Sequence, residues 1–297
     1  MPEVPGTLFV VATPIGNLED ITPRAVETLR RAAVIACEDT RRTGALLRHL
    51  GIRPPRIVSY HKFNERGRRD LILSVLRSGQ DVAIVSDGGT PAISDPGAVV
   101  VEAALQEGLR VSPIPGPSAI AAAASVSGFI SASFLFVGFL PAVSGRRRRA
   151  LEELSDEPRP MVFLEAPHRV ARAARDMLQI LGDRPVTLVR EATKLYEEVR
   201  RTTLGALAEG FATTAARGEH TLVVSGGAPV KRSRARARQG EMGEPGDQAV
   251  PRAPPPAELR GRYEQLIEEG IDRREALKTV MRESGLPRRE VYRAVRP

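Results

Sequence analysis

The sequence predicts an α/β protein with two α/β domains, a parallel-sheet N-terminal domain and a mixed-sheet second domain, plus a small helical module at the C-terminal end. Three observations predict this. Short apolar runs alternate with helical patterns early in the chain, two strand-like runs later follow one another directly, and a Pro/Gly/Arg-rich stretch without periodicity precedes a helical tail. The expected parts are a first domain at 1–125, a second domain at 126–227, a disordered linker at 228–257 and a helix-turn-helix-like module at 258–297.

Five apolar runs predict the strands of the first domain, with helical patterns between and after them. Fully apolar strands that alternate with helices are typical of a parallel sheet covered on both faces. Asp95 and Pro96 are expected to begin one helix, as its N-cap and its first helical residue. The expected strands are Leu8–Ala12, Val34–Cys37, Ile57–Tyr60, Val82–Ser86 and Arg110–Ile114, and the expected helices are 23–32, 40–50, 66–78, 96–107 and 118–125.

The second domain is predicted to contain at least one antiparallel strand pair, because the runs at 185–190 and 197–203 have no helix between them. Three short helical patterns follow in the tail, where Gly285 is expected to end one helix and Pro287 to begin the next. The remaining strands of the second domain are expected at 134–138, 161–164 and 220–225, and its helices at 145–154, 168–181 and 204–217.

Composition narrows the class of protein. The formal net charge is +8, and residues 228–297 hold 16 Lys/Arg against 11 Asp/Glu, which suggests a polyanionic partner. Trp is absent and aromatic residues make up 4%, which argues against a broad aromatic platform for stacking bases. The single cysteine, Cys37, excludes an internal disulfide and a multi-cysteine zinc site, and its apolar neighbours predict that it is buried.

No membrane segment or secretion signal is expected. The N-terminus lacks a basic region before its five-residue apolar run. Residues 111–145 carry no charge, but several prolines and glycines interrupt them, so they cannot form one long apolar helix. We therefore expect a cytoplasmic protein without a membrane partner.

Polar or Pro/Gly loops follow all five strands of the first domain. Parallel strands end at the same edge of a sheet, where ligands bind, so these loops are expected to lie together. The loop with Gly88 and Gly89 allows close approach of a ligand to the backbone, yet it lacks the Lys of a P-loop, which predicts a ligand other than a polyphosphate. For one such loop alone, an ordinary turn is the alternative. The five loops are Thr13–Asn17, Glu38–Arg41, His61–Glu65, Asp87–Pro91 and Pro115–Ser118.

Five motifs in order resemble the tetrapyrrole methylase superfamily, and within it the branch of ribosomal RNA small subunit methyltransferase I. The resemblance covers about residues 6–227, and the tail from Glu258 also resembles the helical module of that branch. Three positions depart from the usual pattern: Lys62 replaces an acidic or polar residue, Leu164 an aromatic residue and Ala192 a leucine. The five motifs are Thr13-Pro14-Ile15-Gly16-Asn17-Leu18, Glu38-Asp39-Thr40-Arg41, Ser86–Gly97, Pro115-Gly116-Pro117-Ser118-Ala119 and Glu165-Ala166-Pro167-His168-Arg169. Two further motifs add to the resemblance: Gly138-Phe139-Leu140-Pro141 and Arg190-Glu191-Ala192-Thr193-Lys194.

This resemblance implies a methyl donor, S-adenosylmethionine, in the cleft between the two α/β domains, and no metal. It also implies a homodimer, and 2′-O-methylation of a cytidine, expected to be cytidine 1402, in the 16S rRNA of the small ribosomal subunit. The residues that it assigns to the donor are Pro14, Ile15, Asp87, Gly88, Gly89, Ala92, Ile93, Ser118, Ala119, Leu164, Glu165, Ala166, Leu222 and Val223.

The loops Glu38–Arg41 and His61–Glu65 contain the side chains expected to act on the acceptor. A ribose 2′-OH is a weak acid, so a base that accepts its proton, or a cation that polarises it, assists transfer. Asp39, His61 and Glu65 are candidate bases and Arg41 a candidate phosphate ligand, with Asp39 and Arg41 ranked first. As alternatives, Asp39 caps the following helix, Arg41 is a solvated helix residue and His61 is structural.

Charged pairs outside these loops also have two interpretations. Glu165 and Glu191 either serve the site or pair with Arg169 and Arg190 as ordinary surface ions. The run Arg146–Arg149 either contacts phosphates or forms a solvated face.

Two other functions remain open at this point. A methyltransferase acting on a tetrapyrrole is the first alternative, but such a substrate needs neither the basic tail nor the arginine run. A non-catalytic RNA-binding protein is the second, but it has no need of five ligand loops at one sheet edge.

Overall fold

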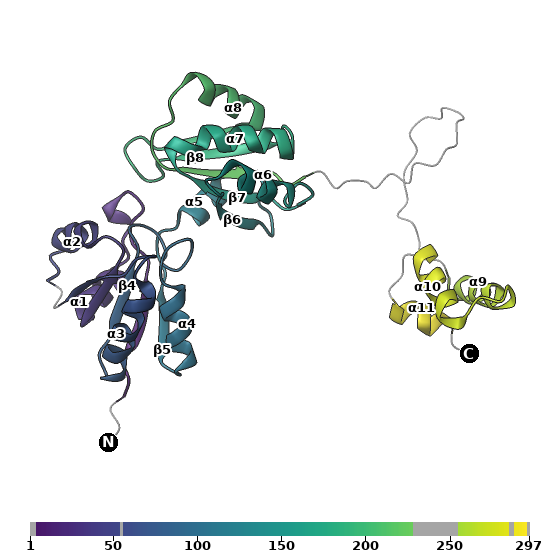
Figure 1. The fold of residues 1–297 in the computed structure, drawn as a ribbon, viewed down its shortest axis with the longest axis horizontal. Coiled ribbons are helices and arrows are strands. Elements are labelled where there is room, and N and C mark those ends of the chain that lie inside the picture. Colours follow the sequence, from purple (N-terminus) through teal and green to yellow (C-terminus); the bar gives the residue numbers. More distant parts are fainter. Residues whose placement is uncertain (1–3, 54–55, 228–254, 285–287, 296–297) are drawn as a thin grey trace. The chain divides into compact units, whose positions relative to one another are not determined.

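The computed structural model describes residues 4–53, 56–227, 255–284 and 288–295. These residues fall into two compact units, one ending at residue 227 and the other beginning at residue 255. Figure 1 shows the first unit with two α/β parts and the second as a helical cluster. The linker predicted at 228–257 lies outside the described residues except for its last three, and Gly285 and Pro287 lie outside them as well.

The first sheet is parallel throughout, as predicted, with the order β3-β2-β4-β1-β5. Its strands agree with the predicted runs to within one residue at each end. The strands are β1 (Thr7–Val11), β2 (Val34–Cys37), β3 (Ile57–Ser59), β4 (Val82–Val85) and β5 (Arg110–Ile114). The helices of this part are α1 (Pro23–Arg31), α2 (Thr40–His49), α3 (Glu65–Arg77) and α4 (Ala98–Gln106), with a short 3-10 helix at Leu18–Asp20.

Side chains of this sheet alternate between two hydrophobic cores, which explains why its strands are apolar throughout. Val82 and Ile84 of β4 face the core that includes residues of α3 and α4. Ala83 and Val85 face the core that includes residues of α1 and α2. Cys37 is fully buried in the latter core, as predicted. Burial on both faces fixes the register, because a slip of one residue would exchange the two faces.

The carboxyl edge of this sheet has a switch point between β1 and β4, where connections depart to opposite sides. Thr13 after β1 and Gly89 after β4 bridge the two loops, each N–H donating to the other's carbonyl at 2.9 Å. The loops after β1 and β4 are therefore joined at the switch point, which is where α/β sheets bind ligands.

The predicted start of α4 is wrong. Asp95 does not cap this helix, which begins at Ala98 with Gly97 at its N-cap. The preceding loop folds back on itself, because the Ala92 N–H donates to the Pro96 carbonyl at 3.2 Å. Gly97 has φ +144°, a conformation that glycine adopts readily and other residues rarely do.

The second sheet is mixed, as predicted, with the order β6-β7-β10-β8-β9. Only β6 and β7 pair in parallel, and the predicted antiparallel pair is β8 with β9. The strands are β6 (Leu135–Phe139), β7 (Met161–Glu165), β8 (Pro185–Arg190), β9 (Glu198–Thr203) and β10 (His220–Val224). The helices are α5 (Ala119–Val126), α6 (Ser144–Glu152), α7 (Pro167–Leu181) and α8 (Leu204–Thr213).

One face of the second sheet packs with α6, α7 and α8, and the other with α5. Leu222 belongs to the core on the first of these faces, and Val223 to the core that contains Ala123 of α5. The helix α5 follows the last strand of the first sheet yet packs on β8 and β10, so it joins the two parts of this unit.

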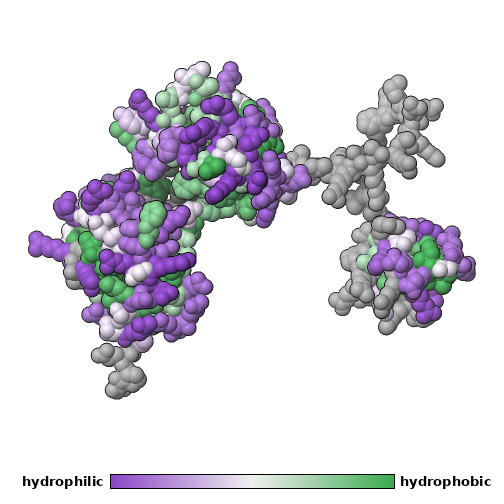
Figure 2. All heavy atoms as spheres, in the orientation of Figure 1, coloured by the Kyte–Doolittle hydropathy of each residue, from purple (hydrophilic) through white to green (hydrophobic). Residues whose placement is uncertain are grey.

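The second unit consists of α9 (Pro256–Glu268), α10 (Arg273–Ser284) and α11 (Arg288–Val295), the three helices predicted for the tail. Five buried residues form its small core: Leu259, Leu266, Ala276, Val280 and Val291. Figure 2 shows hydrophilic residues interspersed with apolar ones over the visible surface of both units. None of the helices in the described part of the chain is long and apolar enough to cross a bilayer.

Candidate functional site

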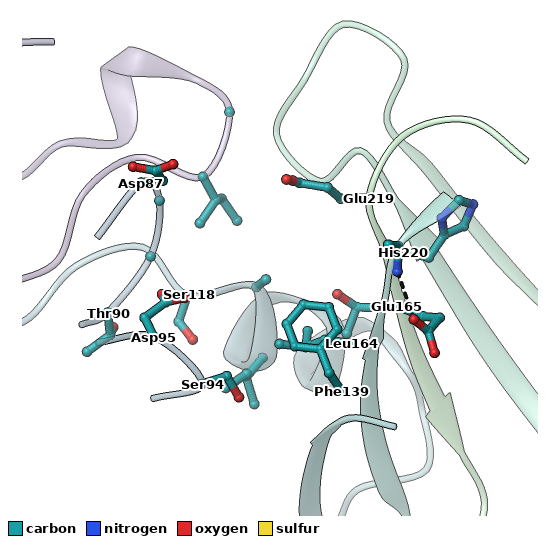
Figure 3. Close-up of a pocket in the computed structure, with 18 of the residues that line it drawn as sticks. Asp87, Thr90, Ser94, Asp95, Ser118, Phe139, Leu164, Glu165, Glu219 and His220 are labelled. Atoms are coloured by element: carbon teal, nitrogen blue, oxygen red, sulfur yellow. Dashed lines mark hydrogen bonds between the residues drawn. The ribbon is translucent and has the colours of Figure 1, made fainter. Parts of the chain in front are cut away.

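A cavity of about 630 Å³ lies between the carboxyl edge of the first sheet and the facing edge of the second. This donor cavity, as we call it, falls within the range of roughly 300–1,000 Å³ that is usual for small-molecule sites. Figure 3 shows Thr90, Asp95 and Ser118 on one wall and Phe139 and Leu164 on the other.

Most of the residues assigned to the donor from the sequence line this cavity. Three of them do not. Ala92 is half-buried and is not among the lining residues, while Leu222 and Val223 are fully buried in the two cores of the second sheet. Thr221 and His220 of the same strand line the cavity in their place. The residues of the set that line it are Pro14, Ile15, Asp87, Gly88, Gly89, Ser118, Ala119, Ile93, Leu164, Glu165 and Ala166.

Gly88 and Gly89 form part of the wall of the donor cavity without side chains. A Cβ at Gly88 would lie 3.0 Å from the Pro14 carbonyl oxygen, closer than nearly all real contacts. Gly89 has φ +88°, and a Cβ there would meet the Ile15 side chain at 3.5 Å. The backbone conformation therefore favours glycine at position 89, and a side chain at position 88 would require the Pro14 carbonyl to shift, so the cavity is bounded there by backbone.

Two carboxylates on the first-domain wall of the donor cavity differ in their partners. Arg42 and Asp87 form an ion pair at 3.4 Å, whereas Asp95 has no such cationic partner among the described ion pairs. Burial raises the pKa of Asp95 to about 6, and the carboxylates of Glu38 and Asp87 add to that rise. The first-domain wall thus presents a carboxyl that a cationic ligand would stabilise.

Glu165 ends β7 and is almost completely buried. Its Oε1 accepts the Ala166 N–H at 3.1 Å and lies 3.1 Å from Arg169 Nε. Burial raises the pKa of Glu165, which that pairing only partly offsets. Arg169 also donates to the Leu140 carbonyl. The predicted pair of Glu165 with Arg169 is therefore present, but it is buried and links β7 to α7, whereas surface ions were expected.

The other predicted pair is wrong. Glu191 pairs with Lys194 at 2.9 Å, and Arg190 pairs with Glu198 across β8 and β9. Lys194 also reaches Glu219 at 2.9 Å and lines the donor cavity. The backbone at Glu191 turns with φ +49°, so its side chain leaves the strand that carries Arg190.

The loop after β1 contacts the loop after β8, which fixes one end of the donor cavity. Asn17 N–H donates to Thr193 Oγ1 at 3.0 Å. Gly16 lies so close that a Cβ there would be 2.4 Å from a side-chain carbon of Lys194. The two parts of this unit therefore meet through motif residues of both.

A second cavity, which we call the acceptor cavity, gathers three of the four predicted catalytic residues. Asp39, Arg41 and His61 line it, and Asp87 lines both this cavity and the donor cavity. Its volume is about 500 Å³. The fourth residue, Glu65, is not among its lining residues and occupies the first position of α3.

Asp39 and Arg41 form one hydrogen-bonded unit. Asp39 caps α2 by accepting the Arg41 backbone N–H at 2.8 Å, which confirms the capping interpretation. The Arg41 guanidinium donates to the same carboxylate at 3.2 and 2.9 Å. These bonds lower the pKa of Asp39 to about 2, so its carboxylate is a weak proton acceptor at neutral pH. Asp87 Oδ1 accepts the Asp39 N–H at 3.0 Å and ties this unit to the donor wall.

The arginine run is partly structural. Arg147 is buried and pairs with Asp176 at 2.7 Å, and Arg148 reaches the same carboxylate at 3.1 Å. Arg146 and Arg149 are exposed, so only these two remain available for a phosphate. The sequence showed four adjacent cations but could not show that Asp176, 29 residues beyond Arg147, takes up two of them.

Sequence reasoning missed several residues of the donor cavity. Asp95 was interpreted as a helix cap, although it belongs to the Gly-rich loop that had already been singled out. Phe139 and Lys194 lie in motifs that the resemblance included without giving them a role. The other missed lining residues are Gly16, Leu18, Arg42, Thr90, Ser94, Ile120, Pro167, His168, Glu219, His220 and Thr221.

Comparison with known proteins gives the family. Residues 7–208 match the model of the Tetrapyrrole (Corrin/Porphyrin) Methylases. The chain belongs to the tetrapyrrole methylase family. It is 42% identical over 287 residues to the Ribosomal RNA small subunit methyltransferase I of Halalkalibacterium halodurans, and the match covers 97% of this chain and 93% of that protein. The resemblance drawn from the five motifs is thereby confirmed.

A shorter relative and a solved structure complete the comparison. The Ribosomal RNA small subunit methyltransferase I of Thermotoga maritima is 47% identical, and the match covers 74% of this chain and 99% of that protein. The crystal structure of uroporphyrin-III C-methyltransferase from Thermus thermophilus complexed with S-adenosylhomocysteine has a TM-score of 0.53 at 23% identity, covering 74% of this chain and 97% of that one. This likeness concerns the fold of the tetrapyrrole methylases.

Proposed function

We propose that this chain transfers a methyl group from S-adenosylmethionine to the ribose 2′-OH of a cytidine in 16S rRNA, expected to be cytidine 1402. The observation that carries the proposal is the pair of adjacent cavities with Asp87 in the wall of both. The donor cavity has the size of a nucleoside-like ligand, and the acceptor cavity is lined by the exposed Arg41. The names of relatives at 40–48% identity support ribosomal RNA as the acceptor.

The donor cavity fits S-adenosylmethionine in size and chemistry. The molecule combines a zwitterionic amino-acid part, a sulfonium cation and an adenosine. Backbone at Gly88 and Gly89 and the hydroxyl of Ser118 can bind its polar groups, and the apolar Leu164 and Phe139 can cover its adenine. Asp95 provides a negative charge for the cationic part. The donor supplies an electrophilic methyl group, and the chain orients it.

The acceptor side acts mainly by placement. The neutral thioether that a sulfonium releases is a good leaving group, so orienting the ribose oxygen in line with the methyl group supplies much of the rate, and the 2′-OH proton passes to solvent water. Arg41, whose side chain is 89% exposed, can bind a phosphate of the substrate while Asp39 holds its guanidinium. With a pKa near 2, Asp39 serves better as this positioning group than as the general base.

The chain is further proposed to act as a homodimer in the cytoplasm, where small ribosomal subunits are assembled. Its tail unit is proposed to hold RNA. About a quarter of this chain has no counterpart in the Thermotoga maritima relative, which supports an accessory role for part of the chain.

The test is methyl transfer by the purified chain to two acceptors. Labelled S-adenosylmethionine is offered with small ribosomal subunits from cells lacking the modification, or with a uroporphyrin-type tetrapyrrole. We expect label in rRNA, recovered as 2′-O-methylcytidine after nuclease digestion, and none in the tetrapyrrole. Label in the tetrapyrrole alone, or on a base, would contradict the proposal.

The role of the Asp39–Arg41 unit is tested by Asp39→Asn. Asparagine also caps helices, so α2 should be retained while the charge that holds Arg41 is lost. Turnover should fall by about 10²-fold with donor affinity unchanged, the usual effect of misplacing a reacting group. Near-normal turnover of the folded variant would remove Asp39 from the site.

A further inference from the structure

Phe63 is the most exposed large hydrophobic residue in the described part of the chain, with 95% of its surface accessible to solvent. It lies in the loop between β3 and α3, and together with His61 and Lys62 it lines the acceptor cavity. A phenylalanine in this position gives up the free energy of burial that such side chains normally gain on folding. Its place beside a polar cavity therefore requires an explanation.

The loop holds this ring outward on a rigid backbone. The Asn64 and Glu65 N–H groups donate to the His61 carbonyl at 2.9 and 3.0 Å. The Asn64 side chain accepts the His61 N–H at 2.8 Å and donates to the Ser59 carbonyl at 3.2 Å.

Phe63 itself is anchored through its backbone. Its N–H donates to His61 Nδ1 at 3.2 Å, and the two rings lie edge to face at 6.1 Å. The backbone under the ring is thus already ordered, so a ligand that covers the ring would not have to order the loop.

The charges around the ring indicate what covers it. The side chains of Arg41 and Lys62 are exposed at the same cavity. Cations beside an exposed aromatic face suit a nucleotide, whose phosphates are anionic and whose base has two π faces. Proteins recognise single-stranded RNA by stacking its bases on such side chains.

We propose that Phe63 stacks against an unpaired base of the RNA substrate at the mouth of the acceptor cavity. This inference rests on the proposed function, because it takes RNA as the substrate, and it adds the residue that holds a base. Low aromatic content excludes a broad stacking platform, whereas a single ring at the cavity mouth holds one base.

The test measures binding of single-stranded RNA without methyl transfer. A labelled oligonucleotide of mixed sequence is compared with a strand of the same length and charge that carries abasic riboses. The full-length chain is assayed unaltered and as Phe63→Leu, which keeps an apolar side chain without a π face, and as Phe63→Trp, which restores one. Leu105→Ala, an exposed apolar residue at the far end of α4, is the matched control.

Stacking on one base is typically worth a factor of about 5 to 150 in affinity. We expect Phe63→Leu to weaken binding of the base-bearing strand by at least about 5-fold, to leave the abasic strand unaffected, and to leave the affinity for S-adenosylmethionine unchanged. Phe63→Trp and Leu105→Ala should bind both strands as the unaltered chain does.

Three results would overturn the inference: equal affinity of Phe63→Leu and the unaltered chain for the base-bearing strand, an equal loss on both strands, or no binding of the oligonucleotide at all. Failure of the proposed function would show itself separately, as absence of methyl transfer to ribosomal RNA by the unaltered chain.

Discussion

Asp95 is expected to lower the stability of the protein while serving the donor cavity. Its pKa lies at about 6 instead of 3.8, because burial and the carboxylates of Glu38 and Asp87 disfavour its charged form more than the bond to Ser86 favours it. A tenfold change in proton affinity corresponds to about 1.4 kcal/mol, which sets a ceiling of about 3 kcal/mol. Because the carboxyl is partly exposed, solvent screening reduces the expected effect to about 1–2 kcal/mol.

The perturbation is Asp95→Asn, which removes the charge and keeps the shape. Near pH 8 the Asp95 carboxyl is ionised in the folded and unfolded states, so the variant should be more stable than the parent by about 1–2 kcal/mol. As the pH falls through 6, folded Asp95 takes up a proton and the parent recovers its stability. By pH 4 the difference in the free energy of unfolding between Asp95→Asn and the unaltered protein should approach zero.

The assay is urea unfolding followed by circular dichroism at pH 8, 6 and 4. Asp87→Asn is the comparison, because Asp87 accepts the Asp39 N–H and pairs with Arg42, so its replacement should give no gain. A lower urea midpoint for Asp95→Asn at pH 8, or a gain that does not change with pH, would refute the reasoning.

Three further predictions follow from the site. Ala119→Leu should fill the donor cavity and abolish binding of S-adenosylmethionine, measured by calorimetry, whereas Ala121→Leu, on the exposed side of the same helix, should bind it normally. Equal binding by both variants would show that the donor binds at another site. Arg147→Ala should lower the free energy of unfolding by about 1–3 kcal/mol, because the buried Asp176 loses one of its two cationic partners and keeps only Arg148, whereas Arg149→Ala should leave stability unchanged and weaken RNA binding. Deletion of residues 228–297 should keep donor binding but weaken RNA binding and flatten its dependence on salt, and an unchanged salt slope would show that the tail holds no RNA.

Short apolar runs were sufficient to predict the strands of the first sheet. β2 and β5 begin and end at the predicted residues. The start of α4 could not be predicted in the same way. Asp95 and Pro96 carry a local helix-start signal, but the loop folds back through the Ala92–Pro96 hydrogen bond and gives Gly97 the capping position.

At the candidate site, the positions of the loops could be predicted from the sequence, but the contacts of their side chains could not. The loops were predicted because they follow strands of one parallel sheet. The sequence could not show that Asp39 and Arg41 neutralise one another, since both a cap and a free pair were compatible with their spacing. It also could not show that Phe63 points into solvent, because an aromatic residue after a strand is more often buried.

We propose that this chain methylates a ribose of the small-subunit ribosomal RNA. Mass spectrometry of nucleosides from purified 16S rRNA, prepared from cells with and without the protein, tests it most directly. We predict that 2′-O-methylcytidine decreases by one residue per rRNA molecule in cells that lack the protein and returns when the protein is restored. An unchanged amount of 2′-O-methylcytidine would contradict the account.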